Sequence, residues 1–256
     1  MPTDHRPLSG RAAAQQRIAA RRAAESAARQ AAERRHRQLV GAVVTAVLLV
    51  VAVVVVVAVQ SSRTSTAADA ATPAGTTGGY AFAVGQADAP VTVQLYEDYQ
   101  CPNCKAFEDA AGSTLEQLVA AGTVRVEYHG MAFLDTSGND RYSTRALNAA
   151  AVVASTAGTD ALERFHDLLY ANQPAEGGSG LTDEQLVSYA QQAGATGATV
   201  SRQITDLTYG DWVAGATEQA SKDGVTGTPT VFVDGERLGD LSAAGVTAAV
   251  TAAQAG

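Results

Sequence analysis

The sequence contains two cysteines, Cys101 and Cys104, separated by two residues. They follow a segment of alternating apolar and polar residues, 91–95, and precede a helical stretch, so Cys101 is predicted to lie at a helix N-terminus. Unpaired backbone N–H groups and the helix dipole favour an anion there, so the pKa of the Cys101 thiol should fall below its ordinary value of about 8.5. Pro102 suits the first helical position because no N–H is needed there. Cys104, one turn later, would be more buried and would act as the resolving thiol, so the pattern favours a redox pair.

Other roles for the two cysteines have less support. A zinc site would need two more ligands, and the sequence has neither a second CxxC nor a closely spaced histidine pair. A structural disulfide that closes so short a loop would constrain the chain little. A copper site made by Cys101, Cys104 and a histidine stays open as an alternative.

A second motif, Gly227-Thr228-Pro229-Thr230, directly precedes the predicted strand 231–233. Proline cannot donate a hydrogen bond to a sheet ladder, so Pro229 is expected at the start of the strand. If the Thr228–Pro229 bond is cis, the backbone turns sharply and leaves polar groups of Thr228 facing outward. Those groups could pair with an extended peptide.

The remaining pattern predicts an α/β domain over 79–256. Strands are expected at 91–95, 124–128 and 230–233, with a tight turn at 234–235 and a return at 236–238. Residues 140–222 are predicted to be almost wholly helical, and a last helix covers 242–253. Two capping boxes are predicted, Asp160 with Glu163 and Thr182 with Gln185. The element order indicates an α/β domain with a helical insertion.

An apolar segment, 39–59, precedes this domain. It has no charged residue, and as a helix it would span roughly 31 Å, close to the hydrocarbon thickness of a bilayer. We therefore predict a single transmembrane helix. Removal of the segment is the alternative, because Ala68-Asp69-Ala70 loosely resembles a cleavage site, although the apolar run is longer than is usual in a signal peptide.

Charge predicts the orientation of this span. The basic segment 1–38 carries nine arginines against three acidic residues, whereas the whole chain has a net charge of −8. By the positive-inside bias the N-terminus should be cytoplasmic and the C-terminal domain extracytoplasmic. Residues 60–78 are small and polar, which is typical of a flexible linker. Topology alone explains the arginines, and aromatic residues make up only 5% of the chain, so neither feature favours nucleic-acid binding.

Both motifs resemble those of DsbA-like thiol–disulfide oxidoreductases of the thioredoxin superfamily. The resemblance rests on segments 96–105 and 227–232, together with 165–173, and covers about residues 80–256. It implies a thioredoxin-like fold with helices inserted between its two halves. It also implies that Pro229 is cis and lies against the Cys101–Cys104 pair.

The chain departs from this family at two positions. Many relatives have a buried acid six residues before the first cysteine, where this sequence has Leu95. Glu97 lies two residues later, on the same face of a strand, and could serve as the proton relay for Cys104. The equal alternative is a solvated acid at a strand end. Asn103 stands where the strongest oxidants of the family have histidine, so we expect a milder oxidant.

Other polar and aromatic residues receive structural interpretations. His166 is expected to pack on the helix face of Leu162 and Leu169, without a catalytic role, and His129 is expected at the surface. Trp212 and Phe107 are assigned to the core, and Asp98 to a loop without a role that the sequence reveals.

The predicted function is a membrane-anchored, extracytoplasmic thiol–disulfide oxidoreductase that introduces disulfides into exported proteins with free cysteines. The catalytic residues would be Cys101 and Cys104, with Glu97, Thr228 and Pro229 in support. No metal or organic cofactor is needed, because the electrons travel through sulfur. The resemblance implies reoxidation by a membrane quinone-linked partner. The alternatives are a reductase or isomerase that uses the same pair, a peptide-binding module and a copper-handling protein.

Overall fold

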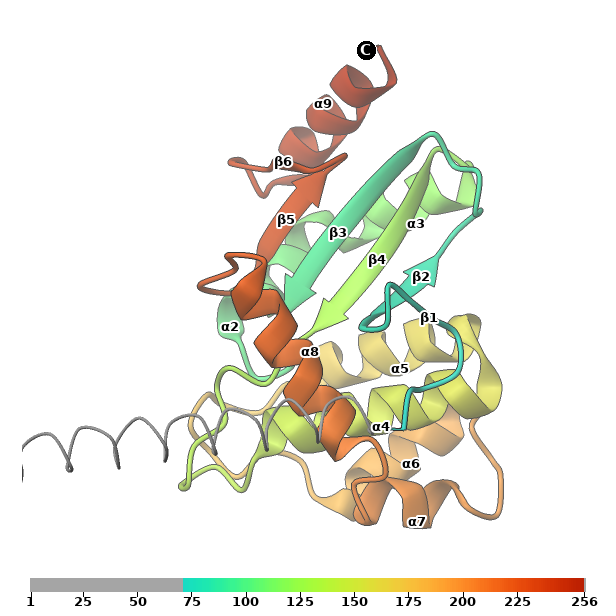
Figure 1. Ribbon diagram of the computed structural model, residues 1–256, viewed down its shortest axis with the longest axis vertical. Coiled ribbons are helices and arrows are strands. Elements are labelled where there is room, and N and C mark those ends of the chain that lie inside the picture. Colours follow the sequence, from blue (N-terminus) through green and yellow to red (C-terminus); the bar gives the residue numbers. More distant parts are fainter. Residues whose placement is uncertain (1–70, 256) are drawn as a thin grey trace, which may run out of the picture. The chain divides into compact units, whose positions relative to one another are not determined.

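The structure, a computed structural model, describes residues 71–255 (Figure 1). Within these residues six strands form one mixed sheet in the order β1-β2-β4-β3-β5-β6. The strands are β1 (Thr76–Thr77), β2 (Ala81–Val84), β3 (Val91–Glu97), β4 (Val124–Gly130), β5 (Thr230–Val233) and β6 (Glu236–Arg237).

The two central strands, β3 and β4, are parallel and pair from Val91 opposite Val124 to Glu97 opposite Gly130. Their carboxyl ends therefore share one edge of the sheet, and the chain leaves β3 at that edge to reach Cys101. The strand β5 is antiparallel to β3, with Thr230 opposite Tyr96. This register brings the start of β5, and the Pro229 that precedes it, to the same edge.

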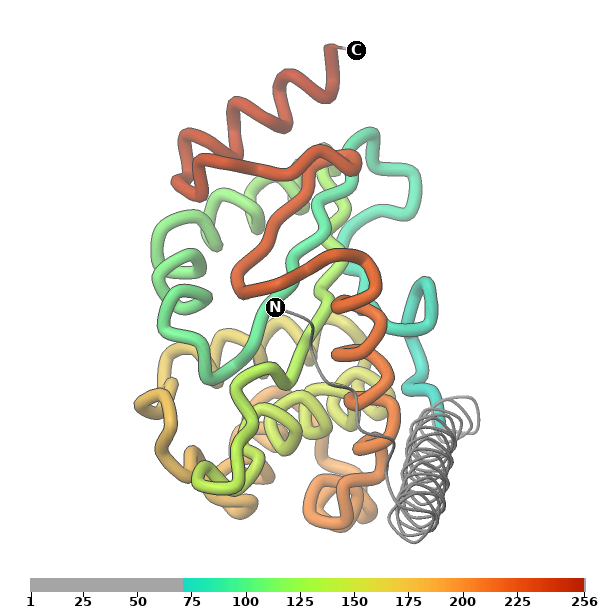
Figure 2. Tube along the Cα trace, turned by 60° about the vertical axis from the view of Figure 1, so that its left-hand side comes forward, coloured from blue at the N-terminus to red at the C-terminus, as the bar shows by residue number. Residues whose placement is uncertain are grey.

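Helices cover both faces of the sheet. On one face lie α2 (Pro102–Phe107), η1 (Glu108–Gly112), α3 (Ser113–Ala120) and α9 (Ala243–Gln254). Figure 2 shows α3 on one side of the sheet and α8 on the other. Alternate β3 residues, Val91, Val93 and Leu95, are fully buried against the first group of helices. Successive strand side chains point to opposite faces, and this alternation is the pattern that predicted the strand.

A helical insertion separates β4 from β5. Its helices are α4 (Tyr142–Ala157), α5 (Thr159–Ala171), α6 (Asp183–Ala193), α7 (Val200–Thr205) and α8 (Gly210–Lys222). The α4 helix lies at its centre and contacts the other four. Small alanine side chains on α4, including Ala146, Ala149 and Ala150, are buried and let the neighbouring helices approach closely.

The predicted strands and the hairpin are present, and the structure adds two strands that the sequence patterns did not indicate. Thr76 and Thr77 of β1 pair with β2, so the end of the segment 60–78, expected to be a flexible linker, belongs to the sheet. The helical stretch after Cys104 is also not one regular helix. Its middle, Glu108–Gly112, has π-helical hydrogen bonding.

One of the two predicted capping boxes is confirmed. Thr182 and Gln185 form both reciprocal hydrogen bonds at the start of α6. The box predicted for Asp160 and Glu163 is wrong, because α5 begins at Thr159, directly after Gly158, and has no side-chain cap. Gly158 has a φ of 84°, which suits the sharp turn between α4 and α5.

The predicted transmembrane helix at 39–59 and the basic segment 1–38 lie outside the described residues. Between residues 71 and 255, no helix combines the length and the apolar character needed to cross a membrane.

Candidate active site

Cys101 lies at the N-terminus of α2, as the sequence predicts. It is the N-cap residue with an extended backbone (φ −77°, ψ 116°), and Pro102 opens the helix. The Cys101 carbonyl oxygen accepts hydrogen bonds from the backbone N–H groups of Cys104 at 3.1 Å and Lys105 at 3.2 Å. Both cysteines are thiols, with Cys101 6% and Cys104 1% exposed. The N-cap position brings the Cys101 sulfur next to the first free N–H groups of the helix.

The environment drives the pKa values of the two thiols apart. Hydrogen bonds lower the pKa of Cys101 to about 5 against the effect of burial; the largest contribution comes from the Cys104 side chain, and backbone N–H groups of Asn103 and Cys104 add to it. The same hydrogen bond to Cys101, burial and the negative charge of Glu97 raise the pKa of Cys104. At neutral pH, Cys101 is therefore a thiolate and Cys104 a thiol, which is the division between attacking and resolving sulfurs.

The second motif lies directly beside Cys101. The Sγ atom of Cys101 is 3.4 Å from the carbonyl oxygen of Thr228, and the Thr228–Pro229 bond is cis, in agreement with the resemblance. The Thr230 hydroxyl donates to the Gly227 carbonyl at 2.8 Å and closes this turn. The structure therefore brings the cysteine pair and the Thr228–Pro229 bond together, as the resemblance implies.

Glu97 is buried, so its interpretation as a solvated acid at a strand end is wrong. It is 2% exposed, lies at the end of β3, and one carboxylate oxygen is 2.9 Å from Nε2 of His166. The Tyr170 hydroxyl donates to the other oxygen at 3.0 Å. Burial by itself would lower the pKa of His166, but the charge of Glu97 raises it well above the ordinary value. The two side chains therefore form a buried ion pair between the sheet and α5.

His166 packs among the buried residues of α5, such as Leu162 and Leu169, as predicted. Its pairing with Glu97 is a further role that the helical pattern did not reveal, because the partner lies 69 positions away in the sequence.

Glu108 belongs to the same charged cluster. Burial raises its pKa to about 7, against the opposing charge of His166. One ligand atom from each of Glu97, Glu108 and His166 falls within 4.8 Å of the others. These atoms could hold a cation only with a neutral His166, whereas the charge of Glu97 keeps this imidazole protonated. This group, found within residues 71–255, includes neither cysteine, so it gives no support to the copper alternative.

Asp98, for which the sequence pattern indicates no role, is also fully buried. Its carboxylate accepts hydrogen bonds from the backbone N–H groups of Gln100 at 2.9 Å and Leu134 at 3.0 Å, and from the hydroxyl of Ser143 at 2.6 Å. Burial raises the pKa of Asp98 to about 6. Asp98 thus ties the segment before Cys101 to α4. One feature of the sequence could have indicated this role: Asp98 is an acidic residue in the short segment that joins the predicted strand to Cys101.

The other structural interpretations have mixed outcomes. Trp212 and Phe107 are buried, as expected, and the Trp212 indole donates to the Gly79 carbonyl at 2.7 Å. His129 was expected at the surface, but it is only partly exposed and stacks on Tyr96 with 4.3 Å between ring centroids. Burial lowers the pKa of His129.

A dithiol at a helix N-terminus, beside a cis-proline turn at the edge of a mixed sheet, defines a thioredoxin-type redox site. Comparisons with known proteins agree. A family model described as Thioredoxin matches residues 77–252. Reduced DsbG, a disulfide bond oxidoreductase from Mycobacterium tuberculosis, shares 31% identity and a TM-score of 0.60 over 67% of this chain and 86% of its own. Oxidised DsbA from the same organism shares 30% identity and a TM-score of 0.61 over 69% of this chain and 93% of its own.

A similar segment occurs in a much longer protein. The serine/threonine-protein kinase PknE of Mycobacterium tuberculosis is 31% identical over 156 residues, which are 58% of this chain and 28% of the kinase. The chain thus spans little more than a quarter of that relative. With the family match and the two structures, the chain belongs to the thioredoxin family, among its DsbA-like thiol–disulfide oxidoreductases.

Proposed function

We propose that the chain oxidises pairs of cysteines in exported proteins through a disulfide between Cys101 and Cys104. The observation that carries this proposal is the contrast between the two sulfurs. Cys101 is a stabilised thiolate at a helix N-terminus, whereas Cys104 is buried with a raised pKa. A stabilised thiolate favours the reduced form of the enzyme, and an enzyme whose reduced form is favoured tends to oxidise its substrates.

The proposed reaction has two exchange steps. A client thiolate attacks Sγ of Cys101 in the oxidised enzyme, the Cys101–Cys104 bond breaks, and the Cys104 sulfur leaves and takes up a proton. A second client thiolate then attacks the client sulfur of the mixed disulfide and releases Cys101 as a thiolate. Two electrons pass from the client to the enzyme. The client's two thiols lose two protons, of which Cys104 keeps one and solvent takes the other.

Glu97 is our candidate for the proton relay to Cys104. Its charge contributes to the raised pKa of Cys104, and its carboxylate is held in place by His166 and Tyr170. Glu97 would take the proton of His166, which lies 2.9 Å away, and pass it to the Cys104 sulfur as that sulfur leaves. His166 would then regain a proton from solvent.

Thr228 and Pro229 are proposed as the platform for the client peptide. Thr228 lies against Cys101 at 3.4 Å. An extended peptide that pairs with the backbone there would present its sulfur to the reactive atom.

The proposal places the domain outside the cytoplasmic membrane. Residues 39–59 would anchor it with the N-terminus in the cytoplasm, and a quinone-linked membrane partner would reoxidise it. An oxidising compartment is needed for protein disulfides to persist. This assignment rests on the apolar segment and the arginines that precede it.

The experiment that tests the proposed reaction uses the purified oxidised chain and a reduced, unfolded protein with two cysteines. We expect one client disulfide to form for each enzyme disulfide consumed, measured by thiol counting and mass spectrometry. The matched control is the Cys101→Ser/Cys104→Ser variant, which should bind the same client without oxidising it. A chain that reduces an oxidised client but does not oxidise a reduced one would favour the reductase alternative. Client binding without exchange would favour the binding module.

A further inference from the structure

The loop between α5 and α6, residues 172–182, contacts the backbone of the active-site segment directly. The side-chain amide nitrogen of Gln173 donates to the Cys101 carbonyl at 2.9 Å and to the Tyr99 carbonyl at 3.2 Å. A primary amide has two N–H donors, and Gln173 uses both on this segment. The helical insertion thus reaches the nucleophile through one side chain, 72 positions away in the sequence.

The contact is reciprocal. Gln100, which lies between the two carbonyls that Gln173 binds, sends its own side chain into the loop. Its amide nitrogen donates to the carbonyls of Gly178 at 2.8 Å and Ala175 at 3.3 Å, and its oxygen accepts from the Asn139 amide at 2.7 Å. Two glutamines thus join the loop and the active-site segment in both directions.

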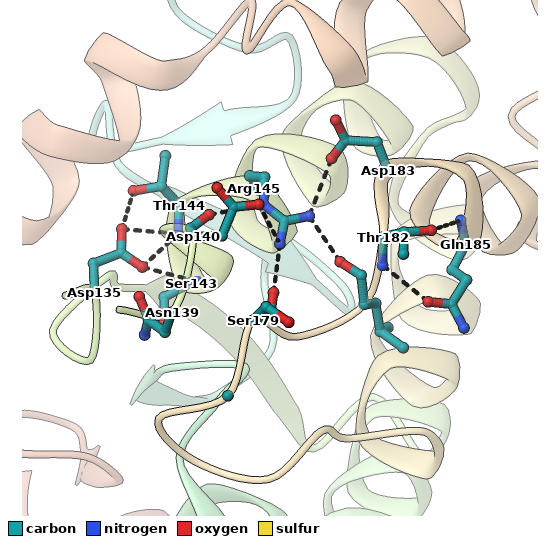
Figure 3. A network of polar contacts seen from close by, with 12 residues as sticks. Asp135, Asn139, Asp140, Ser143, Thr144, Arg145, Ser179, Thr182, Asp183 and Gln185 are labelled. Carbon is teal, nitrogen blue, oxygen red and sulfur yellow. Dashed lines mark hydrogen bonds and ion pairs between the residues drawn. The ribbon is translucent and has the colours of Figure 1, made fainter. Parts of the chain in front are cut away.

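The far end of the loop is fixed to α4, as Figure 3 shows. The Arg145 guanidinium donates to the carbonyls of Ser179 and Leu181 at 2.7 Å each, and it pairs with Asp183 at 3.1 Å. Close packing adds to this, because a Cβ atom on Gly180 would overlap the Tyr142 ring. The loop is therefore held at its middle and at its end, so Gln173 projects from a fixed support.

We infer that Gln173 is a positioning residue for Cys101 that keeps the nucleophile in the geometry in which helix α2 stabilises its thiolate. This inference rests on the proposed role of Cys101. The Cys104 side chain and, to a smaller extent, the backbone N–H groups of Asn103 and Cys104 lower the pKa of Cys101, and Cys101 lies beside them because it is the N-cap residue of α2. Gln173 holds the carbonyl of Cys101 itself. It also places partial positive charge beside the reactive residue, which favours the anion.

The test is the pH dependence of Cys101 alkylation in the reduced full-length chain. Gln173→Met keeps the approximate size of the side chain, adds no charge and removes both donors. We expect the thiolate midpoint to rise by about half a pH unit, the size expected for the loss of a typical hydrogen bond. The equilibrium constant with glutathione should then shift by about threefold toward the oxidised enzyme.

The matched control is Gln191→Met, at an exposed position on α6 of the same insertion, which should leave the midpoint unchanged. If Gln173→Met does not fold, as judged by circular dichroism, Gln173→Asn replaces it. This variant keeps the amide but is too short to reach both carbonyls, so the midpoint should rise by less. A folded variant of either kind with a wild-type midpoint would overturn the inference. Alkylation needs no client, so a failure of client oxidation in the wild type would count against the proposed function alone.

Discussion

The Sγ atom of Cys101 lies 3.4 Å from the carbonyl oxygen of Thr228, although the two residues are 127 positions apart in the sequence. The parallel pairing of β3 with β4 and the antiparallel pairing of β5 with β3 produce this neighbourhood, because they bring the end of β3 and the start of β5 to one edge. Any peptide that approaches the Thr228 backbone therefore meets the reactive sulfur.

Replacement of Cys101 and replacement of Cys104 by serine should have different effects on disulfide exchange. Cys101→Ser should abolish disulfide exchange, because the sulfur that exchanges with the client is lost. Cys104→Ser cannot form the enzyme disulfide, but its Cys101 thiolate can still attack the disulfide of an oxidised client. The resulting mixed disulfide should accumulate, since no Cys104 thiol remains to attack Cys101 and release it. Non-reducing electrophoresis with mass spectrometry of the trapped species distinguishes the two. A Cys104→Ser chain with full turnover would contradict the assigned roles.

The reduced and oxidised forms should differ in their pH dependence of stability. Folding lowers the Cys101 pKa from its ordinary value to about 5, so the thiolate contributes stability that is present at high pH and lost as the pH falls between these two values. The oxidised form has no such thiol. The melting temperature of the reduced form relative to the oxidised form should therefore decrease from about pH 9 to about pH 5 and then level off. A constant difference across this range would argue against a stabilised thiolate.

The buried pair of Glu97 and His166 should matter strongly for stability. His166→Phe would leave the Glu97 carboxylate buried without its counter-charge, which typically costs about 3–5 kcal/mol. Urea unfolding at neutral pH measures this cost. The matched control is Asp167→Asn, which alters an exposed carboxylate 3.9 Å from the other ring nitrogen and should cost less than about 1 kcal/mol.

The same pair predicts a pH trend. The folded pKa of His166 is raised above 6.5, so its contribution is complete below that pH and declines as the pH rises toward the folded pKa. This part of the wild-type pH profile should be missing in His166→Phe. Two results would rule out a buried ion pair. One is an equal loss of unfolding free energy in His166→Phe and Asp167→Asn, and the other is the same pH profile of stability in His166→Phe as in the wild type.

Two glycines with almost the same backbone conformation test whether the loop 172–182 packs on α4 as described. Gly177 and Gly180 have φ values of 77° and 76°, so alanine is strained at both positions. An added Cβ meets nothing within 4 Å at Gly177, but it would overlap the Tyr142 ring at Gly180. Gly180→Ala should therefore cost about 1–3 kcal/mol more than Gly177→Ala in chemical unfolding. If the two costs are equal, the loop is not packed on α4 as described.

Much of the redox site could be predicted from sequence because its determinants are local. Alternation in 91–95 and 124–128 identified two strands, and Pro102 with the CxxC spacing identified the start of α2. The Glu97–His166 pair could not be predicted, since helical periodicity shows which face of α5 is buried but not what it meets. The very short strand β1 has too few residues for any periodicity to appear.

The most direct test of the central claim is the site and pH dependence of alkylation in the reduced wild-type chain. We predict that iodoacetamide modifies Cys101, identified by peptide mass spectrometry, with a midpoint near the thiolate pKa of about 5, whereas Cys104 stays unmodified while the protein is folded. A midpoint near the ordinary thiol value of about 8.5, or modification of Cys104 before Cys101, would contradict the account.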